Sequence, residues 1–304
     1  MSDNGSKDSA KQDQITSIKV NPGKSFVETP YLTSIINRAL SYLNAGFPVH
    51  LLGPTGSGKT TLALHISQMI GRPTMLVYGD DEFSTSDLVG TDTGYSRKKT
   101  VDNYIHSVLK VEESVNQHWV DNRLTVACRE GYTLLYDEFT RSRPEANNAL
   151  LSVLAEGVLV LPARRGQNGY IKVHPEFKAI FTSNPEEYVG THRTQDALMD
   201  RMITINIPGL DYDTEVAIAV ARSGLPRSSA MYVVSTIHAM RASDIIDHPL
   251  SVRAAIMISR ILAFNDINPK TDFDFYIQTC FDVLKVHKAN QKDQLVALLK
   301  GKTS

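Results

Sequence analysis

Short runs of apolar and β-branched residues recur through the first two thirds of the chain, and longer stretches with helical spacing separate them. The runs do not alternate with polar residues. Apolar runs of this kind are typical of strands in a parallel sheet that helices cover on both faces. The pattern therefore predicts an α/β fold with a parallel five-stranded sheet. The five runs are residues 48–52, 74–78, 133–136, 179–182 and 203–207.

Amphipathic spacing predicts helices around these strands. Residues 30–45 have apolar positions three and four apart and stop at Gly46, and residues 60–70 repeat the pattern and stop at Gly71. Beyond residue 211 the strand patterns disappear, while helical patterns continue almost to the end of the chain. The helices predicted for this last part are 213–223, 229–241, 251–264 and 273 to about 299.

This change of pattern predicts two folded parts and a tail. A strand-rich part at 25–209 precedes a helical part at 210–304, with the boundary at Pro208 and Gly209. Residues 1–24 are rich in Ser, Asp, Lys, Gln and Asn, a composition typical of a disordered polar tail.

Residues Gly53 to Thr60 read G-x-x-x-x-G-K-T between a predicted strand and a predicted helix. Glycines in such a loop let backbone N–H groups approach phosphate oxygens closely. Lys59 supplies a positive charge for the β- and γ-phosphates, and the Thr60 hydroxyl is suited to bind Mg²⁺. The motif predicts a site for a nucleoside triphosphate with Mg²⁺. The predicted nucleotide-binding residues are Gly53, Pro54, Thr55, Gly56, Ser57, Gly58, Lys59, Thr60, Thr61 and Asp137.

Two adjacent carboxylates, Asp137 and Glu138, directly follow the apolar run 133–136. An aspartate at this position can hold Mg²⁺, and a glutamate one residue later can act as a general base toward water. Adjacent acidic residues also occur at solvated strand ends. The phosphate-binding motif and the buried strand favour the catalytic interpretation, which is hydrolysis of the nucleotide.

Three later side chains are candidates for contact with the γ-phosphate. Asn184 follows the fourth predicted strand, where its amide can orient the attacking water, although Asn-Pro is also a turn-forming pair. Arg201 precedes the fifth strand, and Arg253 begins a helix of the last part. A planar guanidinium can bind two phosphate oxygens at once, whereas a single arginine is more often a surface or ion-paired residue. Their order after the other motifs favours the functional interpretation.

Composition limits the classes of partner. The 304 residues are 42% hydrophobic and 21% charged, as in ordinary globular proteins, and the formal charge of −1 gives no drive toward nucleic acids or anionic membranes. The two cysteines, Cys128 and Cys280, are too few for a disulfide framework or a zinc site. No apolar run reaches the length of a membrane span, and the N-terminus is too polar for a secretion signal. We therefore expect a cytoplasmic protein without nucleic-acid or membrane partners.

The order of these motifs resembles that of AAA+ ATPases, in which Walker A, Walker B, sensor 1, an arginine finger and sensor 2 in a helical lid follow one another. Residues 137–151 carry D-E-x-x-R running into A-L-L and look like the MoxR branch. Further segments are similar to the gas vesicle protein N family, in the CbbQ/NirQ/NorQ/GvpN group, and this resemblance extends from Phe26 through the helical part. The segments are 26–31, 79–83, 86–90, 119–124 and 181–188.

The resemblance implies an ATPase, using ATP and Mg²⁺, that assists gas vesicle formation. It implies gas vesicle shell or accessory proteins as partners and association with the vesicle. The Walker A loop would bind the phosphates and Asp137 the Mg²⁺, with Glu138 activating water. Asn184 would be sensor 1 and Arg253 sensor 2.

Arg201 is the expected arginine finger, with Arg193 as the alternative. A finger acts on the ATP of the neighbouring subunit, so the resemblance also implies a homo-oligomeric ring, and a hexamer by analogy with the family. Two other functions stay open. One is activation of a metalloenzyme or a carbon-fixing enzyme, and the other is a nucleotide-binding structural component of the vesicle. A nucleic-acid motor is disfavoured by the neutral charge.

Two segments are candidates for client contact. Two short apolar runs predict an inserted β-hairpin near 157–174, with Pro162 to Gly166 at its tip. Gly94 to Thr100 is rich in glycine, aromatic and basic residues, and we expect a loop there. Ordinary solvated loops are an equally good interpretation of both segments. Asp87 is expected to cap a short helix after residues 84–86.

Overall fold

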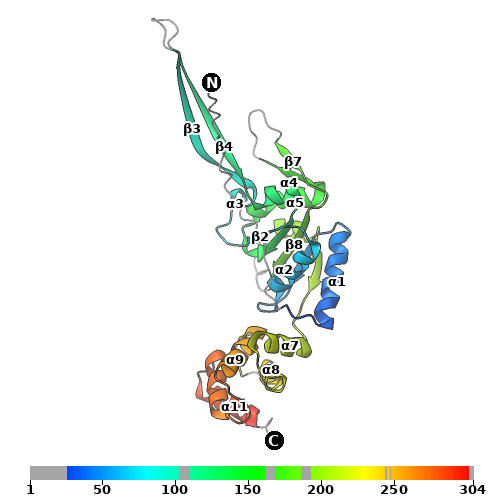
Figure 1. The fold of residues 1–304 in the computed structure, drawn as a ribbon, viewed down its shortest axis with the longest axis vertical. Helices are drawn as coiled ribbons and strands as arrows, with labels where there is room; N and C mark the ends of the chain where they lie inside the picture. The colour runs from blue at the N-terminus through cyan, green and yellow to red at the C-terminus, as the bar shows by residue number, and fades with distance from the viewer. Residues whose placement is uncertain are drawn as a thin grey trace, which may run out of the picture.

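The computed structural model describes residues 26–102, 110–161, 169–185, 193–243, 245–246 and 248–300, with the backbone alone for 92–119 and 193–195. The predicted tail 1–24 and the hairpin tip 162–166 lie outside the described residues. Figure 1 shows an elongated molecule in which a sheet with flanking helices lies in the middle, a group of helices forms one end and a long β-ribbon extends from the other. No described helix is long and apolar enough to cross a membrane.

A parallel five-stranded sheet forms the middle of the molecule, in the order β2-β5-β8-β1-β9. All four strand pairs are parallel, which confirms the predicted α/β class. The register places the last residues of neighbouring strands side by side, for example Leu52 opposite Ser183 and Tyr78 opposite Asp137. The loops that follow β1, β5 and β8 therefore leave the sheet at the same edge. The strands are β1 (Val49–Leu52), β2 (Thr74–Tyr78), β5 (Thr133–Asp137), β8 (Lys178–Ser183) and β9 (Ile203–Asn206).

Helices cover both faces of this sheet because successive residues of each strand point to opposite faces. Leu135 and Ile180 pack with the apolar residues of α1 (Pro30–Asn44) and α2 (Lys59–Ile70). Their neighbours Leu134 and Phe181 belong to a second core cluster on the opposite face. Because both faces of the sheet are covered, successive residues of each strand must be apolar. The helices that contribute to the second cluster include α3 (Thr85–Val89), α4 (Arg123–Glu130), α5 (Pro144–Glu156) and α6 (Arg193–Met199).

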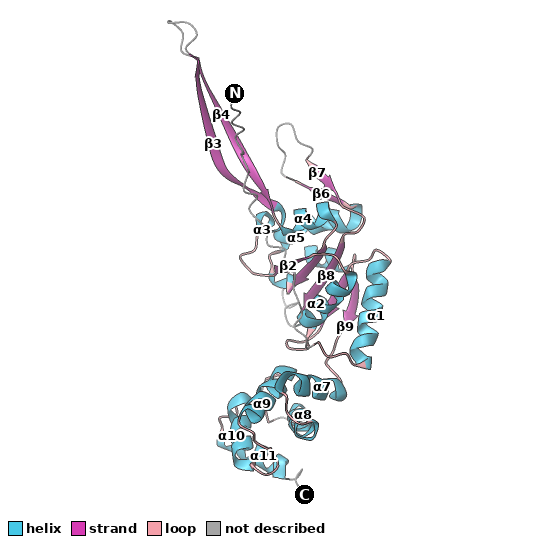
Figure 2. Cartoon of the chain, viewed as in Figure 1, coloured by secondary structure: helices cyan, strands magenta, loops and turns pink. Residues whose placement is uncertain are grey.

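The C-terminal helices form a third core of their own, separate from the two clusters of the sheet. We refer to residues 210–300 as the lid, and Figure 2 shows its helices at the end of the molecule opposite the β-ribbon. The buried Tyr276 hydroxyl donates to Thr236 Oγ1 at 2.9 Å and joins two of these helices. The lid helices are α7 (Tyr212–Ser223), α8 (Arg227–Arg241), α9 (Val252–Phe264), α10 (Phe273–Val283) and α11 (Ala289–Lys300).

The single helix predicted from 273 to about 299 is wrong, because the structure has two helices there with a break at 284–288. Lys285 has a positive φ of 55°, and the Val286 N–H donates to the Phe281 carbonyl to close the end of α10. Leu284 and Val286 are both fully buried in the lid core. Residues two apart lie on nearly opposite sides of a helix, so a continuous helix could not bury both.

The expectation of a loop at Gly94 to Thr100 is also wrong. These residues lie within β3 (Gly90–Asp102), which pairs antiparallel with β4 (Lys110–Asp121). The register shifts between Thr93 and Tyr95, so Gly94 occupies a β-bulge. Figure 2 shows the two strands extending away from the body of the molecule. The polar composition of residues 94–100 hid their strand character, because no alternation of apolar and polar residues marks a strand there.

A second, shorter hairpin lies on the same side of the molecule as the ribbon (Figure 1). β6 (Val158–Val160) pairs antiparallel with β7 (Tyr170–Lys172), where the sequence predicts an inserted hairpin. The short helix expected after residues 84–86 begins earlier, because Ser84 is the N-cap of α3; Asp87 is its third residue and accepts from the Ser84 N–H at 2.9 Å, which completes a capping box.

Candidate functional site

A cavity of about 370 Å³ lies at the edge of the sheet where the strands end, between the glycine-rich loop and the lid. Its walls come from the loop and first turn of α2, from the ends of β5 and β8, and from lid helices α7 and α9. Residues far apart in the sequence thus meet in one site. The sequence-predicted residues that line it are Thr55, Gly56, Ser57, Gly58, Lys59, Thr60, Thr61, Asp137, Glu138, Asn184 and Arg253.

Lys59 is almost completely buried at the first turn of α2. Its ammonium group donates to the Gly53 and Pro54 carbonyls, at 2.8 and 2.9 Å, and to Asn184 Oδ1 at 2.7 Å. The Gly53 and Pro54 carbonyls therefore fix the position of the lysine, and neither residue lines the cavity. The bond to Asn184 joins the phosphate-loop lysine to the residue predicted to sense the γ-phosphate.

The Asp137 carboxylate is 5% exposed and is the meeting point of three elements. The Thr60 hydroxyl, from α2, donates to its two oxygens at 2.9 Å each, and the Thr182 hydroxyl, from β8, donates to Oδ1 at 2.5 Å. A hydroxyl and a carboxylate are oxygen ligands of the kind that Mg²⁺ takes together with phosphates and water. The residues present therefore fit this ion.

The glycine-rich loop fits an anionic ligand for two reasons. The N-terminus of the twelve-residue helix α2 faces the cavity, and unpaired N–H groups of a helix start favour negative charge. In addition, the buried Ser57 hydroxyl has no hydrogen-bond partner among the described residues. Buried polar groups are rarely left unsatisfied, so this loop is built for a polar ligand.

Glu138 adopts a left-handed backbone conformation with φ of 52°, which is uncommon for a residue other than glycine. Its backbone N–H donates to Thr182 Oγ1 at 3.0 Å. Gly79 is required behind it, because a Cβ at that position would lie 2.0 Å from the Glu138 carbonyl oxygen. These contacts turn the chain sharply after β5 and present the Glu138 side chain at the cavity.

Arg141 was not assigned a role from the sequence, yet its Nη1 donates to Glu138 Oε2 at 2.7 Å. The D-E-x-x-R spacing contains the signal, since residues three apart lie on the same side of a helical turn. Arg222 and Arg260 were missed as well, and both line the cavity from the lid together with Arg253. No sequence signal marked them, because their proximity to the loop arises from the packing of α7 and α9.

Arg201 is not part of this cavity. It lines a separate hollow beside α5 and β6, and its guanidinium donates to the Ala197 carbonyl within its own helical turn. The other candidate finger, Arg193, begins α6, and its side chain lies outside the described residues. Within one chain, Arg201 therefore does not join the phosphate-loop residues.

His50 lies on β1, between β8 and β9 in the sheet, and is fully buried. Its Nε2 is 2.8 Å from Ser183 Oγ, and its Nδ1 is 3.1 Å from Thr204 Oγ1, so it bridges β8 and β9. Burial, together with the nearby Lys59 charge, lowers the pKa of His50 to about 4. The ring is neutral at physiological pH.

Fold and site define an ATPase of the AAA class. The AAA domain family (dynein-related subfamily) matches residues 48–202. Among solved structures, a mutant of Thermotoga maritima RuvB is similar with a TM-score of 0.53 at 14% identity, covering 86% of this chain and 72% of that one. Brucella abortus NtrX in complex with ADP is similar with a TM-score of 0.52 at 18% identity, covering 81% and 52%. At these identities the likeness concerns the fold.

Curated relatives identify the family more narrowly. Gas vesicle ATPase GvpN from Ancylobacter aquaticus is 50% identical over 264 residues, which are 87% of this chain and 74% of the relative. GvpN from Haloferax mediterranei is 42% identical over 285 residues, 91% and 80% of the two chains. Protein NorQ from Paracoccus denitrificans is 29% identical over 62% of each chain. The chain belongs to the gas vesicle ATPase GvpN family.

The buried His50 predicts a specific pH dependence of stability. Because its folded pKa of about 4 lies below the unfolded value near 6.5, the unfolded chain binds the proton more readily, and stability is lost as the pH falls from 6.5 toward 4. The His50→Gln variant, which cannot titrate, should lose less of its free energy of unfolding between pH 7 and pH 4.5, by about 2–3 kcal/mol. Urea unfolding followed by circular dichroism measures this.

The exposed His287 provides a control for the substitution itself, and His287→Gln is measured in the same way. If the stability of the parent and of His50→Gln had the same pH dependence, the pKa of His50 would not be lowered by folding.

Proposed function

We propose that this chain is a Mg²⁺-dependent ATPase that acts as an assembly or remodelling chaperone in gas vesicle formation. The observation that carries the ATPase part is the meeting of Lys59, Thr60, Asp137 and Glu138 in one cavity. The gas vesicle part rests on membership of the GvpN family.

In the proposed mechanism, the loop N–H groups and Lys59 would bind the phosphates, and Thr60 and Asp137 would hold Mg²⁺. The ion would draw charge from the β- and γ-phosphate oxygens. Glu138 accepts a proton from the attacking water, and the Asn184 amide orients that water. Since Glu138 is paired with Arg141, its carboxylate must turn away from, or share, this ion pair when it takes the proton.

Two substitutions separate binding from hydrolysis. Lys59→Ala should abolish ATP binding, because it removes the charge that faces the phosphates. Glu138→Gln should retain ATP binding but lower the hydrolysis rate by a factor of about 10²–10⁴, because the amide cannot accept the proton. Fluorescent-nucleotide titration and phosphate release measure the two effects. The exposed Glu130→Gln is the matched control, and parent-like hydrolysis by Glu138→Gln would refute the assignment.

We further propose that the site is completed by a neighbouring subunit in a ring. Arg201 lies outside its own nucleotide cavity, as a residue must if it serves the ATP of another chain. AAA ATPases typically assemble as rings, and a hexamer would place Arg201 of one subunit at the phosphates of the next. Arg193, at the start of the same helix, is the alternative finger.

Mixing two inactive variants tests the shared site. Arg201→Ala chains keep an intact phosphate loop, and Lys59→Ala chains keep an intact finger. Mixed oligomers should therefore regain part of the ATPase activity, whereas each variant alone stays inactive. Phosphate release at several mixing ratios measures the rescue. If Arg193→Ala chains were rescued in place of Arg201→Ala chains, Arg193 would be the finger, and no rescue with either would exclude sharing.

The β3–β4 ribbon and the β6–β7 hairpin are the proposed client-contact elements. Both project on the side of the molecule opposite the lid (Figure 1), and none of their described residues lines the nucleotide cavity. Hydrolysis would then change lid and subunit positions and move these elements against a gas vesicle protein. Activation of a metalloenzyme or of a carbon-fixing enzyme, which the resemblance to the CbbQ/NirQ/NorQ/GvpN group implies, is the second candidate function, and the similarity to Protein NorQ is consistent with that group.

A genetic replacement tests the role in vesicles. In a gas-vesicle-forming cell that lacks its own gene of this family, the parent chain should restore buoyant vesicles, and Glu138→Gln should not, because assembly requires turnover. Flotation and electron microscopy provide the readout. Restoration by Glu138→Gln would indicate a structural role, and unaltered vesicles in the absence of any such gene would exclude a function in assembly.

A further inference from the structure

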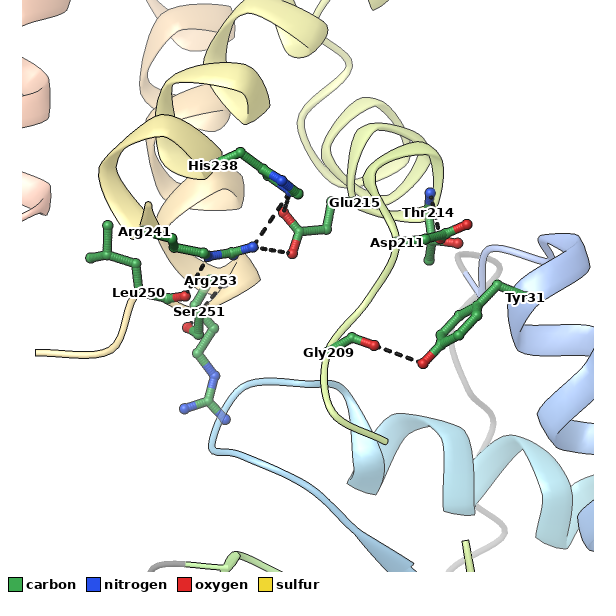
Figure 3. A network of polar contacts seen from close by, with 10 residues as sticks. All are labelled: Tyr31, Gly209, Asp211, Thr214, Glu215, His238, Arg241, Leu250, Ser251 and Arg253. Atoms are coloured by element: carbon green, nitrogen blue, oxygen red, sulfur yellow. Dashed lines mark hydrogen bonds and ion pairs between the residues drawn. The ribbon is translucent and has the colours of Figure 1, made fainter. Parts of the chain in front are cut away.

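The lid contains a buried carboxylate that the nucleotide chemistry does not use. Glu215, in the first turns of α7, is only 2% exposed. Its Oε1 accepts from Arg241 Nη1 at 2.7 Å, and its Oε2 lies 3.1 Å from His238 Nε2 (Figure 3). Both partners belong to the last turns of α8. A charge at this depth is costly unless it is paired, so Glu215 fixes the position of the Arg241 guanidinium.

The same guanidinium also holds the segment that leads into α9. Arg241 Nε donates to the Leu250 carbonyl at 2.8 Å, so one planar group connects the carboxylate of α7 to the backbone just before α9. The donors of an arginine have a fixed relative geometry. The Leu250 carbonyl is therefore placed at a defined position relative to α7, as Figure 3 shows.

Directly after Leu250 the chain reaches the phosphate loop. Ser251 caps α9, with its Oγ accepting from the Arg253 N–H at 3.3 Å. Ser251 packs so closely on Gly56 of the loop that a Cβ at Gly56 would lie 2.4 Å from the Ser251 Cβ. Arg253 follows two residues later and lines the cavity. The position of the Leu250 carbonyl thus determines the position of Arg253 relative to the phosphate loop.

We propose that Glu215 and Arg241 are positioning residues for ATP hydrolysis: they hold residues 250–253 so that Arg253 faces the γ-phosphate. This inference rests on the proposed role of Arg253 at the phosphates. Neither residue touches the nucleotide, since neither lines the cavity. Their effect on catalysis passes through the start of α9.

A purely structural role would have a different signature. If the pair only stabilised the lid, its loss would lower the melting temperature and the amount of folded protein, and its effect on turnover would be independent of Arg253. If it positions Arg253, its loss lowers kcat in a folded protein, and the loss vanishes once the Arg253 side chain has been removed.

Arg241→Lys is the informative variant. A lysine keeps the positive charge beside Glu215, but its single ammonium on a flexible stem cannot hold the carboxylate and the Leu250 carbonyl in one fixed geometry. We expect a folded protein with a melting temperature near that of the parent, and a kcat reduced about 10- to 100-fold through misplacement of Arg253. Arg227→Lys, at the exposed start of the same helix, is the matched control and should keep the parent kcat.

The test is a double-mutant cycle with Arg253→Ala on the full chain, measuring kcat, KM and melting temperature. The proposal expects the double variant to have the kcat of Arg253→Ala alone. If the two losses multiply, or if Arg241→Lys keeps the parent kcat while Arg253→Ala does not, the positioning role is refuted. If Arg253→Ala itself keeps the parent kcat, the proposed role of Arg253 fails instead. Should Arg241→Lys not fold, Glu215→Gln provides the same cycle.

Discussion

The hydrogen bonding of the Asp137 carboxylate is the interaction on which the rest of the structure depends. The Thr60 hydroxyl of α2 and the Thr182 hydroxyl of β8 both donate hydrogen bonds to this carboxylate. Asp137 itself is the last residue of β5. A largely buried carboxylate needs such partners, because burial removes most of its contact with water. Satisfying it brings the phosphate-loop helix and two neighbouring strands to fixed positions. The Lys59–Asn184 bond then adds the residue that follows β8.

The lid has an apolar core of its own, separate from the two cores of the sheet. At the hinge, the Tyr31 hydroxyl donates to the Gly209 carbonyl at 2.7 Å, and Thr29 and Thr214 share a buried hydrogen bond of 2.7 Å. At the phosphate loop, Ser251 packs on Gly56. A group of helices with its own core can move as a body relative to the sheet.

Motif-based prediction selected residues that the structure brings together in one cavity, as in the phosphate loop and the Asp137–Glu138 pair, because their chemistry demands particular residues at a particular spacing. It failed where pattern alone had to decide. The helical pattern after residue 273 continues through the break at Lys285, which exists because Leu284 and Val286 both pack into the lid. The β3–β4 ribbon escaped prediction because its residues are polar, so no alternation of core and surface positions marked its strands.

The sequence by itself determined the class of fold and the order of the strands along the chain, and it predicted which residues bind phosphate and activate water. These depend on local patterns of hydrophobicity and on short motifs. Only the tertiary structure decided that Arg141 pairs with Glu138, that Arg201 lies away from its own cavity, and that the Glu215–Arg241 pair fixes the start of α9. These relations arise from the packing of side chains and of elements far apart in the chain, for which local sequence carries no signal.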